Sequence, residues 1–274
     1  MNLSFKNVLL VNGTPRSGTT WLGQIIDSSP HVRYKYQPLF SNTFKERITL
    51  QSSENEVNHF FEEVYNTKDD FLDREKEKKH NIHQRFEQKN TSPDVLSIKH
   101  VRYHYLLPYL LKQIDNLKVC AIIRNPCATL NSWRKAPKEF REVDGNFNEQ
   151  WYFAQQRDRF KPGEYFGFHK WKEAVMIFLT IKKWYPERVH LLQYESLVHK
   201  TMEEVKRLFD FAELKITDQT NDFLKRTLNE HNDDTYSVFK GKKQTEDWKQ
   251  ELDPSIIEQI YRELKETPLE VFLK

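Results

Sequence analysis

Four short apolar runs stand out along the chain, and each is bounded by polar or turn residues. They are Val8–Val11, Val95–Lys99, Lys118–Ile123 and Val189–Gln193, of which Val95–Lys99 is the least apolar. Short runs rich in valine, isoleucine and leucine are typical of strands buried on both faces of a parallel sheet. The pattern therefore predicts a parallel sheet that contains these four strands.

The segments between these runs carry apolar residues at helical spacing. The patterns cover residues 103–114, 126–134, 171–184 and 201–211. Pro108 marks the start of the regular helix in the first of them, since proline fits the first turn of a helix. Asn125 and Pro126 are typical of a helix cap followed by the first helical position. Strands that alternate with helices predict a single α/β domain, residues 1–274, with a parallel sheet flanked by helices.

Residues 66–90 depart from this alternation. Acidic and basic residues crowd together there with few apolar partners, as in Asp69-Asp70 and in Asp73–Lys79. A charge run of this kind predicts a solvated helix or a mobile insertion within the domain. Recognition of a substrate by this segment is the alternative.

The composition limits the possible partners. The chain has 274 residues, of which 38% are hydrophobic and 14% aromatic, enough for a core. Charged residues make up 30% but nearly cancel, to a net charge of +3. A dedicated nucleic-acid binder would carry a clear basic excess, so no nucleic-acid partner is expected. A local basic cleft for a small polyanion remains compatible with this balance.

Neither a membrane span nor a disulfide framework is expected. We find no apolar run near the length that a bilayer requires, and no signal-peptide pattern at the N-terminus. Cys120 and Cys127 are the only cysteines. This usage favours a reducing compartment, and the expected location is the cytoplasm. No oligomeric state follows from these patterns.

The first apolar run leads into the segment Gly13–Trp21, which precedes a helical pattern. A glycine-containing loop between a strand and a helix directs backbone N–H groups and the helix dipole at one anion. Gly13 and Gly18 have the spacing of a nucleoside triphosphate loop, but Thr19 stands where that loop has lysine. The cation is Arg16, inside the loop, whose fork of donors suits a tetrahedral oxyanion. Ordinary ATP chemistry is therefore disfavoured.

The end of the Lys118–Ile123 run carries a second cation. A nucleotide site that holds Mg²⁺ usually has an aspartate at the end of a neighbouring strand, whereas this strand is followed by Arg124. The expected site therefore neutralises its anion with protein groups and holds no metal. His80, His83 and Glu87 could share a helix, but no further ligand completes a metal site, and none is predicted.

Four motifs make the chain resemble the sulfotransferases that use 3′-phosphoadenosine 5′-phosphosulfate (PAPS). The similar segments are Thr14–Leu22, Ile122–Pro126 with Ser132 eight residues beyond Arg124, Tyr194–Leu197, and Lys240-Gly241 followed by Asp247–Lys249. The last motif departs from the family pattern, which has an arginine where this chain has Phe239. The resemblance implies a P-loop-like α/β fold and transfer of a sulfuryl group from PAPS to a hydroxyl group, with 3′-phosphoadenosine 5′-phosphate (PAP) as product.

The resemblance also implies roles for individual residues. The 5′-phosphosulfate would be held by the loop residues Arg16, Ser17, Gly18, Thr19 and Thr20. Arg124 and Ser132 would hold the 3′-phosphate. The remaining cofactor contacts would come from Trp21 against the adenine, Tyr194 near the base, and Lys240 with Gly241 over the 3′-phosphate.

His100 is the predicted catalytic base. It follows an apolar run at the expected carboxyl end of a strand, and cytosolic members of the family place a histidine after a similar Lys-Thr pair. This chain departs from that pattern, because no threonine stands between Lys99 and His100. Lys99 would help the sulfuryl group depart, and Arg16 would neutralise the bridging oxygen. His104 is the alternative base or a substrate contact. Carbohydrate-directed members have a glutamate where this chain has Gln37, which can only hydrogen-bond an acceptor hydroxyl.

The acceptor is expected to enter over residues 34–45 and 137–169. The second segment is rich in aromatic side chains, which stack on sugars or cover apolar alcohols, although many of them will serve the core. The context of Gln37 favours a glycan or glycolipid acceptor. A P-loop nucleotide kinase and an inactive PAP-binding module are the alternatives. The first predicts Mg²⁺-dependent ATP binding, and the second predicts PAP binding without turnover.

Overall fold

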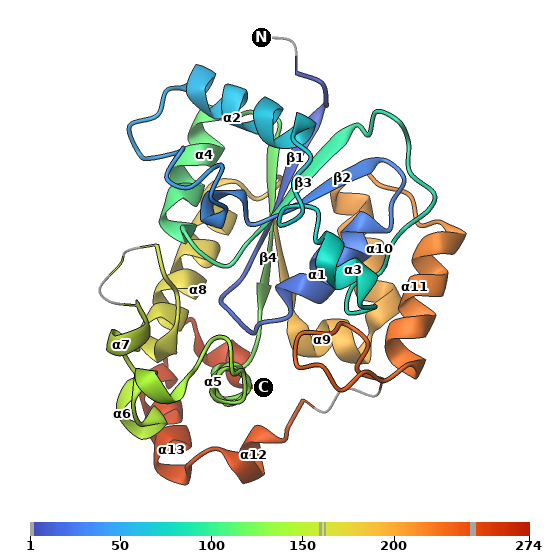
Figure 1. Cartoon of the computed structure of the whole chain (residues 1–274). Helices are drawn as coiled ribbons and strands as arrows, with labels where there is room; N and C mark the ends of the chain where they lie inside the picture. Colours follow the sequence, from blue (N-terminus) through green and yellow to red (C-terminus); the bar gives the residue numbers. More distant parts are fainter. Residues whose placement is uncertain (1–2, 159–160, 162, 242–244) are drawn as a thin grey trace.

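The computed structural model of the chain describes residues 3–158, 161, 163–241 and 245–274. Five parallel strands form one sheet in the order β2-β3-β1-β4-β5 (Figure 1). The strands are β1 (Asn7–Asn12), β2 (Val32–Tyr36), β3 (Val95–His100), β4 (Leu117–Ile123) and β5 (Val189–Gln193). The four predicted strands and the α/β class are confirmed, and β2 is an addition that the apolar runs did not predict.

Helices cover both faces of the sheet. One core contains residues of α2 (Glu54–Asn66), α4 (Leu107–Gln113), α5 (Pro126–Arg134), α8 (Gly167–Trp184) and α13 (Pro254–Leu264). The other contains residues of α1 (Thr19–Asp27), α9 (Tyr194–His199), α10 (Thr201–Phe211) and α11 (Asp218–Asn229). Figure 1 shows α2, α4 and α8 on one side of the sheet and α1, α10 and α11 on the other. Shorter helices lie at the ends of the layers: α3 (Glu75–Lys79), α6 (Phe147–Gln150), α7 (Gln155–Asp158) and α12 (Trp248–Glu251).

The carboxyl ends of the central strands are level with one another. Asn12 at the end of β1 pairs with His100 of β3 and with Ala121 of β4. The chain then leaves β1 at Gly13 and β4 at Arg124, on the same edge of the sheet. Ligands of open α/β sheets bind at this edge, where the strand order reverses. The sheet therefore brings the two predicted cation-bearing turns together.

The helices α5 and α4 begin where the prolines predict. The Asn125 side chain accepts hydrogen bonds from the N–H groups of Cys127 (2.9 Å) and Ala128 (3.3 Å), and Pro126 is the first residue of α5. A 3₁₀ turn, His104–Leu106, leads into α4, which has Pro108 in its first turn. Both prolines lie where a missing N–H leaves no hydrogen bond unmade.

Two further observations concern the cysteines and the helices. Cys120 and Cys127 are both buried and unpaired. Across the part of the chain that the structure describes, no helix combines the length and the apolar character needed to cross a bilayer.

Candidate active site

The turn between β1 and α1 depends on Gly18. This residue has a φ of +95°, in the region that favours glycine, and a side chain there would come within 2.5 Å of the Tyr194 ring. The Ser17 hydroxyl is buried and donates to the Thr14 carbonyl at 2.6 Å, which closes the turn from inside. Thr19 and Thr20 then begin α1, so their N–H groups belong to the helix end that attracts anions.

Arg124 faces this turn. Its Nη1 donates to the Arg16 carbonyl at 3.0 Å, and its guanidinium carbon lies 4.5 Å from the centre of the Tyr194 ring. The Arg124 carbonyl is held by the indole N–H of Trp171 at 3.0 Å. Arg124 Nε is buried and has no hydrogen-bond partner. A buried, unpaired donor on a cation is a ready contact for an anionic ligand.

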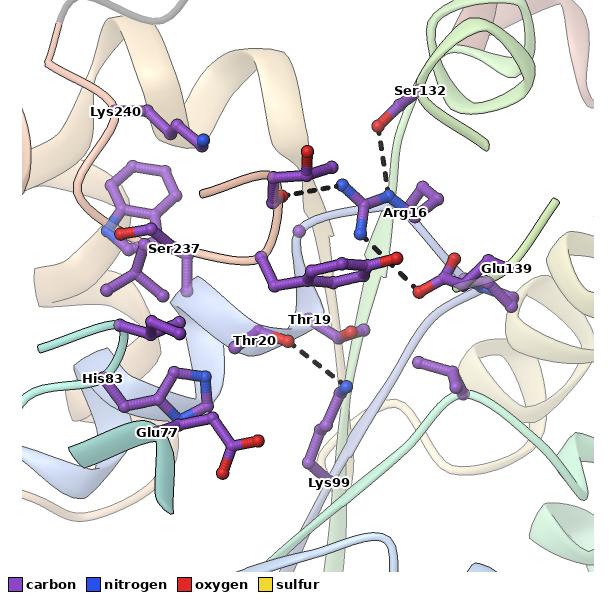
Figure 2. A pocket seen from close by; sticks show the side chains of 18 of the residues that line it. Arg16, Thr19, Thr20, Glu77, His83, Lys99, Ser132, Glu139, Ser237 and Lys240 are labelled. Carbon is purple, nitrogen blue, oxygen red and sulfur yellow. Dashed lines mark hydrogen bonds and ion pairs between the residues drawn. The ribbon is translucent and has the colours of Figure 1, made fainter. Parts of the chain in front are cut away.

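Arg16 joins three distant parts of the chain. Its Nε donates to the Ser132 hydroxyl at 3.2 Å, and its Nη2 donates to the Thr235 carbonyl at 3.1 Å. Its Nη1 lies 3.6 Å from Oε1 of Glu139 (Figure 2). The backbone of Arg16 is left-handed, with a φ of +69°. Such a conformation in a non-glycine residue is uncommon and is found preferentially at ligand sites.

Arg16, Arg124 and Ser132 line a small recess in the protein surface. It has a volume of about 330 Å³, and its lining also includes Lys135 and Lys240. Lys240 Nζ donates to the carbonyls of Asn232 (3.2 Å) and Asp234 (2.6 Å). Burial lowers the pKa of Lys240. We call this space the basic recess. It gathers four cations beside Asp247, an arrangement suited to a phosphate group.

The recess adjoins a larger cavity of about 1130 Å³, with which it shares Arg16, Arg124 and Ser132. Trp21 and Tyr194 line the cavity, and their rings pack edge to face with centres 6.4 Å apart. The indole N–H of Trp21 donates to the Thr227 hydroxyl at 3.3 Å. The volume is large enough for a nucleotide and part of a second substrate.

Lys99 points into the same cavity from β3. Its Nζ donates to the Thr20 hydroxyl at 3.3 Å and lies 4.3 Å from the centre of the Tyr36 ring (Figure 2). Burial lowers the pKa of Lys99, while the Tyr36 and Glu139 side chains act in the opposite direction. Lys99, Thr20 and Arg16 thus surround one part of the cavity with donors.

The structure does not bring the predicted base to this place. Neighbouring residues of a strand point to opposite faces of the sheet, and Lys99 points toward α1. The described residues that line the cavity include neither His100 nor His104. The His104 Nδ1 instead lies 3.2 Å from Asn12 Nδ2, and its ring packs on Tyr165 with centres 4.4 Å apart. Burial lowers the pKa of both histidines to about 3.

Gln37 lies in the cavity wall and is held in place. Its Oε1 accepts from Arg102 Nη1 at 3.0 Å, and Arg102 Nε pairs with Glu164 at 2.8 Å. The Phe40 ring covers the Arg102 guanidinium at 4.0 Å. Gln37 and Phe40 come from the first segment expected to receive the acceptor. Arg157 and Phe166 line the cavity from the second, whereas Phe160 of that segment lies outside the described residues.

Residues of the polar insertion 66–90 also line the cavity. They are Phe71, Arg74, Glu77, Ile82 and His83. The Arg74 guanidinium lies 4.0 Å from the centre of the Tyr36 ring, and its Nη2 pairs with Glu77 at 2.5 Å. Burial, reinforced by Arg74 and Lys99, lowers the pKa of His83 to about 3. A position in the cavity wall agrees with the alternative of substrate recognition by this segment, although charged residues in a loop carry no periodic signal that predicts which of them face the cavity.

Glu139 is a further cavity residue that the sequence patterns did not single out. It lies in the turn that follows α5, seven residues beyond Ser132, where neither a strand end nor a helical face marks it. Three or more clustered His, Cys, Asp or Glu side chains suited to a metal are not found within residues 3–158, 161, 163–241 and 245–274. Two carboxylates of the cavity are paired with arginines, Glu77 with Arg74 and Glu139 with Arg16.

A family model described as a sulfotransferase domain matches residues 6–267. None of the curated protein sequences compared with the chain matches it.

Solved sulfotransferases have the same fold. A mouse sulfotransferase complexed with PAP is 16% identical, with a TM-score of 0.53 over 98% of this chain and 89% of that chain. The sulfotransferase domain from the curacin biosynthetic pathway is 17% identical, with a TM-score of 0.52 over 97% of this chain and 100% of that chain. Retinol dehydratase in a complex with retinol and PAP is 14% identical, with a TM-score of 0.57 over 97% of this chain and 83% of that chain.

Proposed function

This chain belongs to the sulfotransferase family, and we propose that it moves a sulfuryl group from PAPS to a hydroxyl group of a glycan or glycolipid. The observation that carries the proposal is the convergence of Arg16, Arg124 and Ser132 on the basic recess, beside the β1–α1 turn. A bisphosphorylated adenosine has an anionic group at each end, and this arrangement offers donors to both.

The residues present fit such a nucleotide. Arg124 Nε is buried without a partner at the recess, where the 3′-phosphate would bind with Ser132 and Lys240. The N–H groups of the β1–α1 turn, with Thr19 and Thr20, would hold the 5′-phosphosulfate. Trp21 and Tyr194 would flank the adenine. When bound, PAPS supplies an activated sulfuryl group whose leaving group is the 5′-phosphate.

The cations around the reacting group come from the protein. Lys99 Nζ and Thr20 Oγ1 lie 3.3 Å apart, and Arg16 reaches the cavity from the other side. These donors would stabilise negative charge that develops on the phosphate oxygen as transfer proceeds. The strand β4 is followed by Arg124 where a Mg²⁺ site would need a carboxylate. The proposed reaction therefore uses no divalent ion.

An aromatic and cationic surface supports a carbohydrate-bearing acceptor. We call it the acceptor wall, and it consists of Gln37, Phe40, Phe71, Arg74, Arg102 and Phe166. Aromatic faces stack on sugar rings, and Gln37 and the arginines donate to hydroxyl groups. Solved relatives hold apolar alcohols, retinol in one complex and androsterone in another. A test of the acceptor therefore needs both carbohydrate-bearing compounds and apolar alcohols.

We place the reaction in the cytoplasm, because both cysteines are buried free thiols and no disulfide contributes to the described structure. Recovery of the native protein with both thiols reduced after extraction under alkylating conditions would support this location.

A transfer assay tests the proposal. The protein is incubated with ³⁵S-labelled PAPS and a panel of glycans, glycolipids and apolar alcohols, with EDTA present. We expect label in a glycan or glycolipid product and one equivalent of PAP. Label only in apolar alcohols would overturn the proposed acceptor class. PAP binding without any transfer would identify an inactive binding module, and thermal stabilisation by ATP-Mg²⁺ above that by PAP would identify a kinase.

A further inference from the structure

The proposed reaction needs a group that takes the proton of the acceptor hydroxyl. His100 and His104 do not line the cavity, and Val101, which does, has no ionisable side chain. Resting on the proposed function, we propose that Glu139 is the general base of this enzyme. The carboxylate lies beside Arg16 in the cavity, and its charge acts on Lys99.

The position of Glu139 is fixed by its backbone. Its N–H donates to the Ala136 carbonyl at 2.8 Å, and its carbonyl accepts from the indole N–H of Trp133 at 3.1 Å. Trp133 is itself buried, at 2% exposure, and belongs to α5. The turn therefore fixes the backbone from which the side chain reaches the cavity. A base is more effective when its backbone is already in place.

The carboxylate has one oxygen engaged and one free. Oε1 lies 3.6 Å from Arg16 Nη1, which is an ion pair at long range, and the side chain is 24% exposed. Oε2 is buried and has no hydrogen-bond partner. Buried carboxylate oxygens are normally hydrogen-bonded. An oxygen left unpaired at a cavity wall can accept the proton of a substrate hydroxyl.

Glu139 also faces the Lys99–Thr20 pair. Burial lowers the pKa of Lys99, and the charge of Glu139 opposes this shift together with Tyr36. Glu139 likewise acts on Tyr36, whose pKa is set by burial and by the opposing charges of Lys99 and Arg74. Figure 2 shows Glu139, Arg16, Thr20 and Lys99 turned into the same space. The carboxylate thus lies beside the groups that would hold the sulfuryl group.

His83 and Glu77, two other ionisable residues of the cavity, are less suited. Burial and the charges of Arg74 and Lys99 hold the pKa of His83 near 3, so a proton on its ring would add a positive charge among cations. Glu77 is paired with Arg74 at 2.5 Å, a short and direct ion pair. A proton on Glu139, in contrast, removes a negative charge as another develops on the departing phosphate.

In the proposed step one bond to sulfur forms while another breaks. The acceptor oxygen forms a bond to sulfur, and the bond between sulfur and the 5′-phosphate oxygen breaks with its electron pair on that oxygen. The hydroxyl proton passes to Glu139, and water later takes it up. Arg16, adjacent to both the carboxylate and the β1–α1 turn, remains the cation for the phosphate oxygen.

The test compares Glu139→Gln with the wild type on an acceptor that the panel identifies. We expect kcat to fall at least 100-fold, the lower range for a lost general base. PAP affinity, measured by calorimetry, should stay equal or become tighter, because the change removes a negative charge that competes for Arg16. Formate should restore part of the activity of Glu139→Ala. The matched control is Glu149→Gln, an exposed glutamate on α6, which should match the wild type.

Three other outcomes would contradict the proposed base, its catalytic role or the proposed function. If Glu139→Gln keeps kcat within threefold while His83→Gln loses it, the base is His83. If kcat and PAP affinity fall together in Glu139→Gln, the glutamate only positions Arg16. If the wild type binds PAP and yet transfers to no acceptor, the proposed function fails, and the base fails with it.

Discussion

The basic recess and the acceptor wall line adjoining cavities, but they are built largely from different parts of the fold. The recess lies at the ends of β1 and β4 and along α5, where the sheet fixes the backbone, and Thr235, Lys240 and Asp247 complete its lining from the C-terminal part of the chain. The acceptor wall comes from connecting segments and from the insertion 66–90. Elements of the sheet tolerate few sequence changes without loss of the fold, whereas loops tolerate many. The difference indicates that nucleotide binding is set by the scaffold and acceptor choice by its connections.

Loss of Arg124 should separate the two regions most clearly. Arg124→Ala removes a charged donor from the recess, and hydrogen bonds to charged groups contribute about 1.5–3 kcal/mol. PAP affinity should therefore fall roughly 100-fold, as measured by calorimetry. The KM of the acceptor at saturating PAPS should stay near that of the wild type.

The control is Arg207→Ala on α10, which removes a surface arginine paired with Glu203 and Glu204. It should leave PAP affinity unchanged. An acceptor KM that rises with the PAP dissociation constant in Arg124→Ala would show that the two regions are not separable.

A side chain at position 18 should disturb the scaffold itself. Gly18→Ala must adopt a φ of +95° and place its Cβ 2.5 Å from the Tyr194 ring. Gly145→Ala has a similar φ of +84°, yet no atom lies within 4 Å of its Cβ. Both variants carry the backbone strain, and only the first carries the clash. Gly18→Ala should be less stable than Gly145→Ala by about 2 kcal/mol in denaturant unfolding, the usual range of overpacking. Equal stabilities would remove the proposed constraint on the turn.

The buried histidine beside the acceptor wall should make stability depend on pH. The folded pKa of His83 is about 3, below the value near 6.5 of an unfolded chain. The unfolded chain binds the extra proton, so stability falls as the pH drops from about 6.5 toward 3. The free energy of unfolding of His83→Gln should depend less steeply on pH, by up to about 1.4 kcal/mol per pH unit, which corresponds to one proton. His59→Gln, at an exposed position, should keep the wild-type slope. An unchanged slope in His83→Gln would mean that this imidazole is protonated in the fold.

Truncation of Phe40 should have the smallest effect and should be confined to the acceptor. The ring is 45% exposed and covers Arg102 at 4.0 Å. Phe40→Ala should raise the acceptor KM by several-fold, about 1 kcal/mol, and leave PAP affinity unchanged. Phe153→Ala removes a ring of similar exposure, 52%, that packs on Tyr152 and His169. It should change neither quantity. Equal effects of the two variants would argue against Phe40 as an acceptor contact.

The sequence predicted the scaffold better than the wall. Gly18 and Arg124 lie between a strand end and a helix start, and Ser132 lies within α5, eight residues beyond Arg124. Such positions are encoded by local spacing. The strand β2 escaped prediction because Arg33 and Lys35 interrupt its apolar pattern. Lys35 is nevertheless 3% exposed, since its Nζ pairs with Asp73 at 2.7 Å. That partner comes from the charged insertion, and no local pattern could connect the two.

The choice of a catalytic base was also beyond local sequence patterns. A histidine at a strand end was a reasonable candidate, but the alternation of β3 directs Lys99 into the cavity and His100 to the other face. The choice depended on a register that the sequence did not fix to the residue. Glu139 depends on a turn beyond α5 and on Arg16, which is more than one hundred residues away in the chain. Contacts of that kind appear only in the folded protein.

A calorimetric titration of the wild-type protein with PAP in EDTA measures whether the recess and the β1–α1 turn act as one nucleotide site. The recess and the β1–α1 turn should together bind one PAP per chain without any divalent ion. Removal of the 3′-phosphate, in adenosine 5′-phosphate, should weaken binding roughly 100-fold, by the same charged contacts that Arg124 provides. Equal affinities for the two nucleotides, or binding that appears only when Mg²⁺ is added, would contradict the account.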